Sequence, residues 1–223
     1  MIRKELFIIL LDIKTYVKLF LVKLNCHHSL ISHPNNESEM TQIACRIVEA
    51  YDGHINFFRL VKLLYIVEHE SWNKLDQPAM GGEYFSLEGG PMISETANAT
   101  KPKYSEKFQF WAAHLKTTEY KKAGDVKGSE ISLVKSAGRD EIPDALLKIV
   151  DDVISQTQGW KNKQIEDYVH DVKKFAEYKK PSPGGRLPIE AEEILGGFGK
   201  SPEKIKKIQA ESEQWRMFEA ALA

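Results

Sequence analysis

The sequence predicts a mainly α fold: a compact helical domain around a central buried helix, with a small antiparallel β element and a C-terminal amphipathic helix. Residues 56–75 are apolar on almost every helical face, which is typical of a helix enclosed by several neighbours. Residues 84–87 form a short aromatic run bounded by glycines, which is typical of a strand. Residues 201–223 place apolar side chains at three- and four-residue steps after a Ser-Pro start, which indicates an amphipathic helix.

Length and composition fit one globular domain with an appendage. The chain has 223 residues, of which 42% are hydrophobic and 28% charged, so it can bury a core. The net charge of −1 argues against a strong general nucleic-acid binder. The two cysteines, Cys26 and Cys45, form no paired motif, so we expect a reducing compartment and a cytoplasmic protein.

The composition changes at Met40. Residues 1–39 combine an apolar run, which four charged side chains interrupt, with a polar segment. A charge near the membrane centre costs about 2.5–3.5 kcal/mol, so we expect no membrane span and no membrane partner. We interpret 1–39 as an N-terminal extension, either preceding a physiological start at Met40 or forming an appended helix and linker. The domain then covers 40–198, and the C-terminal helix covers 199–223.

Four residues of the extension suggest a soft-metal site, because thiolate and imidazole groups bind zinc. They are Cys26, His27, His28 and His33. Their spacing matches no zinc pattern, and no second ligand pair lies nearby in the sequence. A polar linker is the simpler interpretation, so we expect neither a metal nor another cofactor.

In the central helix, Asn56 is placed to cap the N-terminus, and the apolar pattern ends near Leu75. Glu68, His69 and Glu70 suggest an acid/base cluster. Consecutive helical positions point about 100° apart, so these side chains do not converge. We therefore expect no catalytic site there.

The glycines around the aromatic strand have a conformational role rather than a phosphate-binding one. The segment lacks the Lys-Ser/Thr ending of a phosphate loop. Gly89, Gly90 and Pro91 predict a tight turn after Tyr84–Leu87. Ser94 then caps a short helix that has Glu95 in its first turn.

Further elements follow from periodicity and breakers. We expect a helix capped by Ser105 and extending through Leu115, and a strand near residues 131–134 that pairs with Tyr84–Leu87. The remaining expected segments are a helix from Pro143 to Gly159, a helix from Asn162 through Ala176, a linker over 181–188 and a short helix after it. The last helix docks on its own domain or on a partner, with Ile205 and Ile208 on its apolar side.

The central segment resembles the signature of the Panacea domain, which defines the SocA-like antitoxins. The matching positions are Lys62 to Tyr65, Pro78, Gly81 or Gly82, Tyr84-Phe85, Gly90-Pro91 and Ser94-Glu95, followed downstream by His170. The resemblance covers roughly residues 42–198. Family members often carry a Trp a few residues after the His, where this sequence has Phe175 or Tyr178.

The resemblance implies a mainly helical domain with a small antiparallel β element. It also implies a non-enzymatic antitoxin that binds and neutralises a cognate protein toxin encoded beside it. A homo-oligomer, and an adaptor role that delivers a partner to a protease, stay open. Aromatic and Arg side chains are typical interface anchors. Our candidates for partner contact are therefore Tyr65, Trp72, Tyr84, Phe85, Trp215 and Arg216, and each aromatic among them is also suited to the core.

Two alternatives remain. The first is a DNA-binding autoregulator of its own operon, suggested by a lysine cluster at Lys161, Lys163, Lys173, Lys174, Lys179 and Lys180. Interleaved acids favour a solvated face there instead, so nucleic acid is the weaker expectation. The second is a hydrolase that uses His69 or His170 with Glu68 or Asp171.

Overall fold

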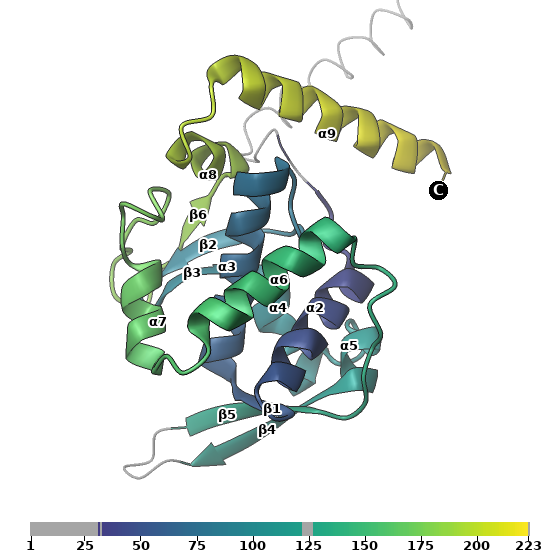
Figure 1. Ribbon diagram of the computed structural model, residues 1–223, viewed down its shortest axis with the longest axis vertical. Coiled ribbons are helices and arrows are strands. Elements are labelled where there is room, and N and C mark those ends of the chain that lie inside the picture. Colours follow the sequence, from purple (N-terminus) through teal and green to yellow (C-terminus); the bar gives the residue numbers. More distant parts are fainter. Residues whose placement is uncertain (1–30, 32, 122–126, 223) are drawn as a thin grey trace, which may run out of the picture.

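The computed structural model describes residues 31, 33–121 and 127–222, and within them the chain is mainly helical, as predicted (Figure 1). The helices are α2 (Glu37–Ala50), α3 (Phe57–Leu75), α4 (Ser94–Ala99), α5 (Gln109–His114), α6 (Asp144–Thr157), α7 (Asn162–Val169), α8 (Ala191–Gly197) and α9 (Pro202–Leu222), with a 3-10 turn at Pro102–Tyr104. The strands are β1 (His54–Asn56), β2 (Tyr84–Leu87), β3 (Gly90–Ile93), β4 (Leu115–Lys121), β5 (Lys127–Leu133) and β6 (Leu187–Ile189).

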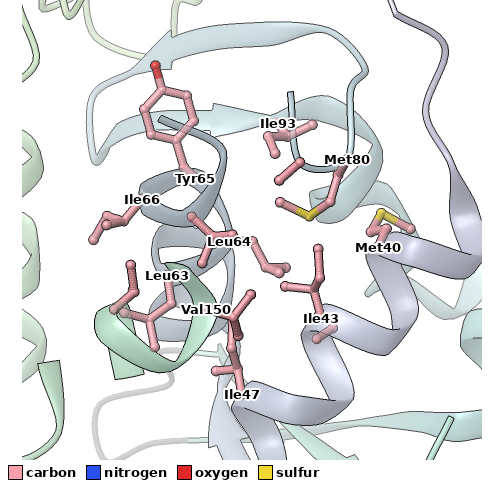
Figure 2. Close-up of a cluster of buried hydrophobic side chains, with 14 of the residues drawn as sticks. Met40, Ile43, Ile47, Leu63, Leu64, Tyr65, Ile66, Met80, Ile93 and Val150 are labelled. Carbon is pink, nitrogen blue, oxygen red and sulfur yellow. The ribbon is translucent and has the colours of Figure 1, made fainter. Parts of the chain in front are cut away.

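Helix α3 is the centre of the domain, and its predicted start is confirmed. The side-chain oxygen of Asn56 accepts a hydrogen bond from the Phe58 backbone amide at 3.0 Å, which satisfies one of the free amides of the first turn. The helix ends at Leu75, and the C-cap residue Asp76 adopts a left-handed conformation with φ of 59°. Helices α2 and α6 pack beside it and bury a common apolar core, in which Ile43 and Ile47 of α2 lie near Val150 of α6 (Figure 2).

Among the described residues, the β element consists of two antiparallel three-stranded sheets. The first has the order β1-β5-β4 and the second the order β3-β2-β6. The prediction that residues 131–134 pair with Tyr84–Leu87 is wrong, because Ile131 pairs with Thr117 of β4 and with Ile55 of β1. The helix expected to run from Ser105 through Leu115 is also shorter than predicted. It begins at Gln109, and Leu115 is the first residue of β4, whose Thr residues favour extended backbone.

The second sheet packs on α3 through β3 and is completed from a distant part of the chain. Its tight turn lies at Glu88-Gly89, so Gly90 and Pro91 belong to β3 rather than to the turn. Segment 181–188 is not wholly a linker, because Leu187–Ile189 forms β6 and pairs Ile189 with Tyr84. A proline is tolerated in β6 because it is an edge strand.

Helix α7 ends at Val169 instead of continuing through Ala176. Beyond it, the Asp171 side chain accepts a hydrogen bond from the Lys173 amide in a non-helical turn. That path leaves Val172 60% exposed and buries Phe175 to 1%. Burying the larger aromatic ring favours the bent path over a straight helix, which explains why the local pattern was misleading.

The packed domain begins before Met40. Gly82 donates its backbone amide to the carbonyl of His33 at 3.1 Å, and Asn36 donates its amide to Met80 at 3.1 Å. The Asn36 side chain also caps α2 by accepting from Glu39. The segment at 33–39 is therefore part of the domain in this structure, and Met40 is fully buried inside α2.

Helix α9 starts where the Ser-Pro pair predicts, and its first half docks on the domain. The Ser201 hydroxyl accepts a hydrogen bond from the Lys204 amide, and Ile208 is 3% exposed. Lys200 and Lys204 both contact the Asp76 carboxylate at 2.7 Å, which ties the start of α9 to the end of α3. None of the helices within the described ranges is long and apolar enough to cross a membrane.

Candidate functional site

The residues of the signature are Lys62, Tyr65, Gly90, Pro91, Glu95 and His170. Lys62 lies on the side of α3 that faces the β2–β3 hairpin, and it is 3% exposed. Its Nζ donates to the carbonyls of Gly90 and Pro91, both at 2.8 Å. Burial lowers the pKa of Lys62 from 10.5 to about 7, against a smaller opposing effect of Glu166. The ammonium group thus fixes the start of β3 on α3.

Gly90 also contacts the end of α7 closely. Its φ is 100°, and a Cβ on it would lie 2.7 Å from Cγ2 of Val169 and 3.2 Å from Nε2 of His170. Both the backbone conformation and the space therefore require glycine. The His170 ring stacks on Tyr178 with centroids 4.7 Å apart, and burial lowers its pKa. One cluster therefore contains four signature residues, namely Lys62, Gly90, Pro91 and His170.

The other two signature residues hold neighbouring parts of the same region. Glu95 accepts a hydrogen bond from the Glu83 amide at 3.0 Å, just before β2. A Cβ at Gly82 would clash with Oε2 of this carboxylate. The Tyr65 hydroxyl donates to Oε1 of Glu177 at 2.9 Å, which links α3 to the segment after α7.

Glu68 is a central residue that sequence reasoning did not identify as structural. Its carboxylate accepts hydrogen bonds from the amides of Ala79, Met80 and Gly81 and from the Tyr84 hydroxyl. Burial raises the pKa of Glu68 to about 7, although the donated hydrogen bonds oppose this shift. The carboxylate organises the loop before β2, and the only sequence signal for it is an acid at an otherwise apolar helical position.

His69 pairs with Glu177 rather than with Glu68. Its Nε2 lies 3.4 Å from Oε1 of Glu177, and its ring packs between Phe175 and Phe198 with centroid distances of 4.3 and 4.5 Å. His69 and Glu177 are 3% and 2% exposed. The structure therefore pairs His69 with an acid that the hydrolase alternative did not name, deep among aromatic rings.

The geometry above can be set beside known families. The model of the family described as antitoxin SocA-like, Panacea domain, matches residues 60–174. The chain belongs to this family. Comparison with curated proteins and with solved structures gave no match. The resemblance seen in the sequence is therefore confirmed, and the six signature residues all lie within the matched range.

In this Panacea domain the signature is largely internal. Among the residues expected to contact a partner, Tyr65, Trp72 and Tyr84 are 0%, 1% and 7% exposed and belong to the core. Trp72 donates its indole N–H to the Tyr84 hydroxyl at 3.2 Å, so these rings also satisfy each other's polar groups. In the described conformation they offer almost no surface to a partner.

The remaining partner candidates are one residue of β2 and two residues of α9. Phe85 is half-buried on β2, and the Arg186 guanidinium lies 4.5 Å from the centre of its ring. Trp215 and Arg216 fall within α9, but their side chains lie outside the described part. Phe85 is thus the candidate whose described side chain keeps a partly exposed surface.

Three of the six lysines in the cluster pair with acids on the described surface. Lys163 lies 2.7 Å from Asp167, Lys174 lies 3.7 Å from Asp171, and Lys179 pairs with Glu193. This pairing reduces the positive charge of the cluster that would be available to a phosphate backbone.

Of the residues considered for a metal, Cys26, His27 and His28 lie outside the described residues. The ring of His33 lies 6.0 Å from that of Trp72 in an edge-on contact. Among the described residues, no group of three or more His, Cys, Asp or Glu side chains is placed to hold a metal ion. A separate surface cleft of about 270 Å³ lies between α2 and α6, with Arg46, Arg139 and Asp151 among its lining residues.

Proposed function

We propose that this protein is the antitoxin of a toxin–antitoxin system and that it neutralises a cognate protein toxin by direct binding. The observation that carries the proposal is membership of the SocA-like antitoxin family, with the matched range covering residues 60–174. The family supports an antitoxin role and suggests that this role is not enzymatic.

The internal contacts of the signature are consistent with a rigid binding module. The signature residues Lys62 and Tyr65, and Glu68 beside them, bond to the protein's own carbonyls, carboxylates and amides. A domain fixed in this way loses little conformational entropy when a partner covers it. Neutralisation would then follow from covering the toxin's functional surface, in the cytoplasm where both proteins are made.

The test is growth rescue with the protein encoded by the adjacent reading frame. That protein is expressed alone and together with this chain, and the two are then mixed as purified proteins. We expect arrest of growth by the neighbour alone, rescue by co-expression, and a stable complex with a defined mass. A neighbour that does not arrest growth, or arrest that this chain does not relieve, contradicts the proposal.

The C-terminal helix is a second contact that we propose for the toxin. Its first half is anchored by Lys204 to Asp76, and Met217 in its second half is 68% exposed. Exchange of Trp215 and Arg216 for alanine tests this contact. Unchanged rescue by a folded double variant would show that the helix does not anchor the toxin.

A further inference from the structure

The second sheet has an outer face that carries apolar side chains. Along β2 the side chains alternate, so that Tyr84 and Ser86 are buried toward α3 while Phe85 and Leu87 are half-buried on the opposite side. We use the name outer face for Phe85, Leu87, Met92 and Pro188 together with Arg186. A sheet with one face on the core normally turns polar side chains outward, so this face is unusual.

Strand register brings the apolar side chains together. Phe85 pairs with Met92 of β3 on one side and with Pro188 of β6 on the other. Directly paired residues lie about 4.5–5.5 Å apart on the same face of a sheet, so the three form one row. Met92 is half-buried and Pro188 is exposed. The row is therefore a continuous apolar strip open to solvent.

Arg186 adds an oriented cation to this strip. Its guanidinium lies 4.5 Å from the centre of the Phe85 ring, and no acidic side chain within the described residues forms an ion pair with it. Stacking on the ring holds the planar group while its N–H edge stays free for an acceptor. Arg beside an aromatic ring is the residue combination typical of interface anchors.

The charges at the ends of β2 decide what kind of molecule fits. Glu83 precedes the strand, Glu88 follows it, and both are exposed. If a second copy packed on this face with two-fold symmetry, either Glu83 would meet Glu83 and Glu88 would meet Glu88, or Glu83 would meet Glu88. Both arrangements bring like charges together. A nucleic-acid backbone would also be repelled by these two carboxylates.

We propose that the outer face is the main surface that contacts the toxin, beside the contact proposed for the C-terminal helix. Its occupant is an apolar patch of the toxin with a carboxylate opposite Arg186 and basic side chains opposite Glu83 and Glu88. This inference rests on the proposed antitoxin function and adds to it the contact surface and the chemistry of the partner.

The experiment measures binding to the purified protein of the adjacent reading frame, together with growth rescue. The variants are Phe85→Ser, Arg186→Glu and the double variant Glu83→Lys with Glu88→Lys. Matched controls are Val172→Ser, which removes an exposed apolar side chain elsewhere, and Arg139→Glu, which reverses an exposed arginine at the surface cleft. Thermal unfolding of every variant verifies that it is folded. If Phe85→Ser does not fold, Arg186→Glu alone tests the outer face.

We expect Phe85→Ser and Arg186→Glu each to raise Kd by about 30-fold or more and to abolish rescue. The double lysine variant should bind more slowly, because it removes attraction to the basic rim of the toxin. The controls should stay within about threefold of the wild-type Kd. Failure of the wild type to bind or rescue overturns the proposed function itself.

Wild-type rescue together with unchanged binding by Phe85→Ser and Arg186→Glu overturns the outer face alone. Sedimentation of the free protein adds a further discriminating result. A wild-type dimer that Phe85→Ser converts to a monomer would assign the face to a second copy and would also overturn the inference.

Discussion

Both sides of the β3-β2-β6 sheet carry apolar side chains, but only the inner side also holds buried polar groups. The inner side faces α3 and combines the core residues Ile93 and Ile189 with the hydroxyls of Tyr84 and Ser86. The Lys62 ammonium of α3 contacts β3 from the same side. The outer side contains Phe85 and Met92 in one cross-strand row. In most one-sided sheets the apolar residues face the core and the polar residues face water.

The difference separates two tasks. Buried polar groups are costly unless they are bonded, so they define a position more sharply than apolar contacts do. On the inner side, Lys62 binds two carbonyls of β3 and Glu68 binds three amides of the loop before β2. These bonds fix the sheet on α3. The outer side then keeps its apolar groups for another molecule.

The largest expected effect comes from Glu68→Ala on the inner side. The substitution leaves the amides of Ala79, Met80 and Gly81 and the Tyr84 hydroxyl without their acceptor. An unsatisfied buried donor costs about 1–3 kcal/mol, so we expect a loss of about 3–5 kcal/mol in unfolding free energy. Urea unfolding followed by circular dichroism measures it.

Glu70→Ala is the matched control for Glu68→Ala. Glu70 lies on the same helix and pairs with Lys74 at 3.2 Å near the surface. Surface pairs of this kind contribute about 0.3–0.5 kcal/mol. Equal losses in the two variants would show that the buried carboxylate has no special role.

A second effect tests how the N-terminal segment supports the same loop. A chain beginning at Met40 loses the cap of α2 by Asn36 and the bonds from Asn36 to Met80 and from Gly82 to His33. Each contributes about 1 kcal/mol, so we expect about 3 kcal/mol less stability than in a chain beginning at Ile31. Indistinguishable unfolding midpoints for the two chains would contradict this and would favour a domain boundary at residue 39.

The pH dependence tests the bond between Lys62 and β3. The folded pKa of Lys62 is about 7 and its ordinary value is 10.5. Between these values the unfolded chain binds one proton more than the folded chain, so stability rises with pH in that window and the burial cost is greatest below pH 7. We expect a gain of roughly 1.5–2 kcal/mol between pH 7 and 8.5, relative to Lys62→Met.

The measurement is urea unfolding at several pH values above 7. Glu68 does not disturb this window, because its pKa, raised by burial to about 7, makes stability fall between pH 4.5 and 7 instead. Lys74→Met is the control, since Lys74 is half-exposed and should leave the slope intact. If the unfolding free energy of Lys62→Met still rises with pH above 7, the rise belongs to another group.

Local signals were sufficient to predict the central elements of this fold. The capped start of α3 at Asn56, the aromatic strand β2 and the start of α9 at Pro202 each depend on residues within one or two turns of chain. The family signature contains Lys62 and Gly90, and the structure adds the contact between them, which the sequence did not predict.

Elements that depend on distant partners could not be predicted. β6 forms from a Pro/Gly-rich segment because Ile189 pairs with Tyr84, about a hundred residues away. Glu68 binds backbone amides, which every loop offers, so no residue pattern reveals its partners. The aromatic side chains of Tyr65 and Trp72 suit a core or an interface equally well, and only the tertiary packing assigns them to the core.

The smallest expected effect is on the outer side, where Arg186→Ala should change unfolding free energy by no more than about 0.5 kcal/mol. Arg186 is exposed and its guanidinium contacts only one face of the Phe85 ring. The same substitution should markedly weaken the complex with the adjacent-frame protein, because the guanidinium is desolvated there against a carboxylate. Calorimetry of unfolding and of binding on one preparation separates the two quantities. A loss of stability as large as that of Glu68→Ala would make Arg186 part of the fold, and the two sides of the sheet would then no longer divide structure from recognition.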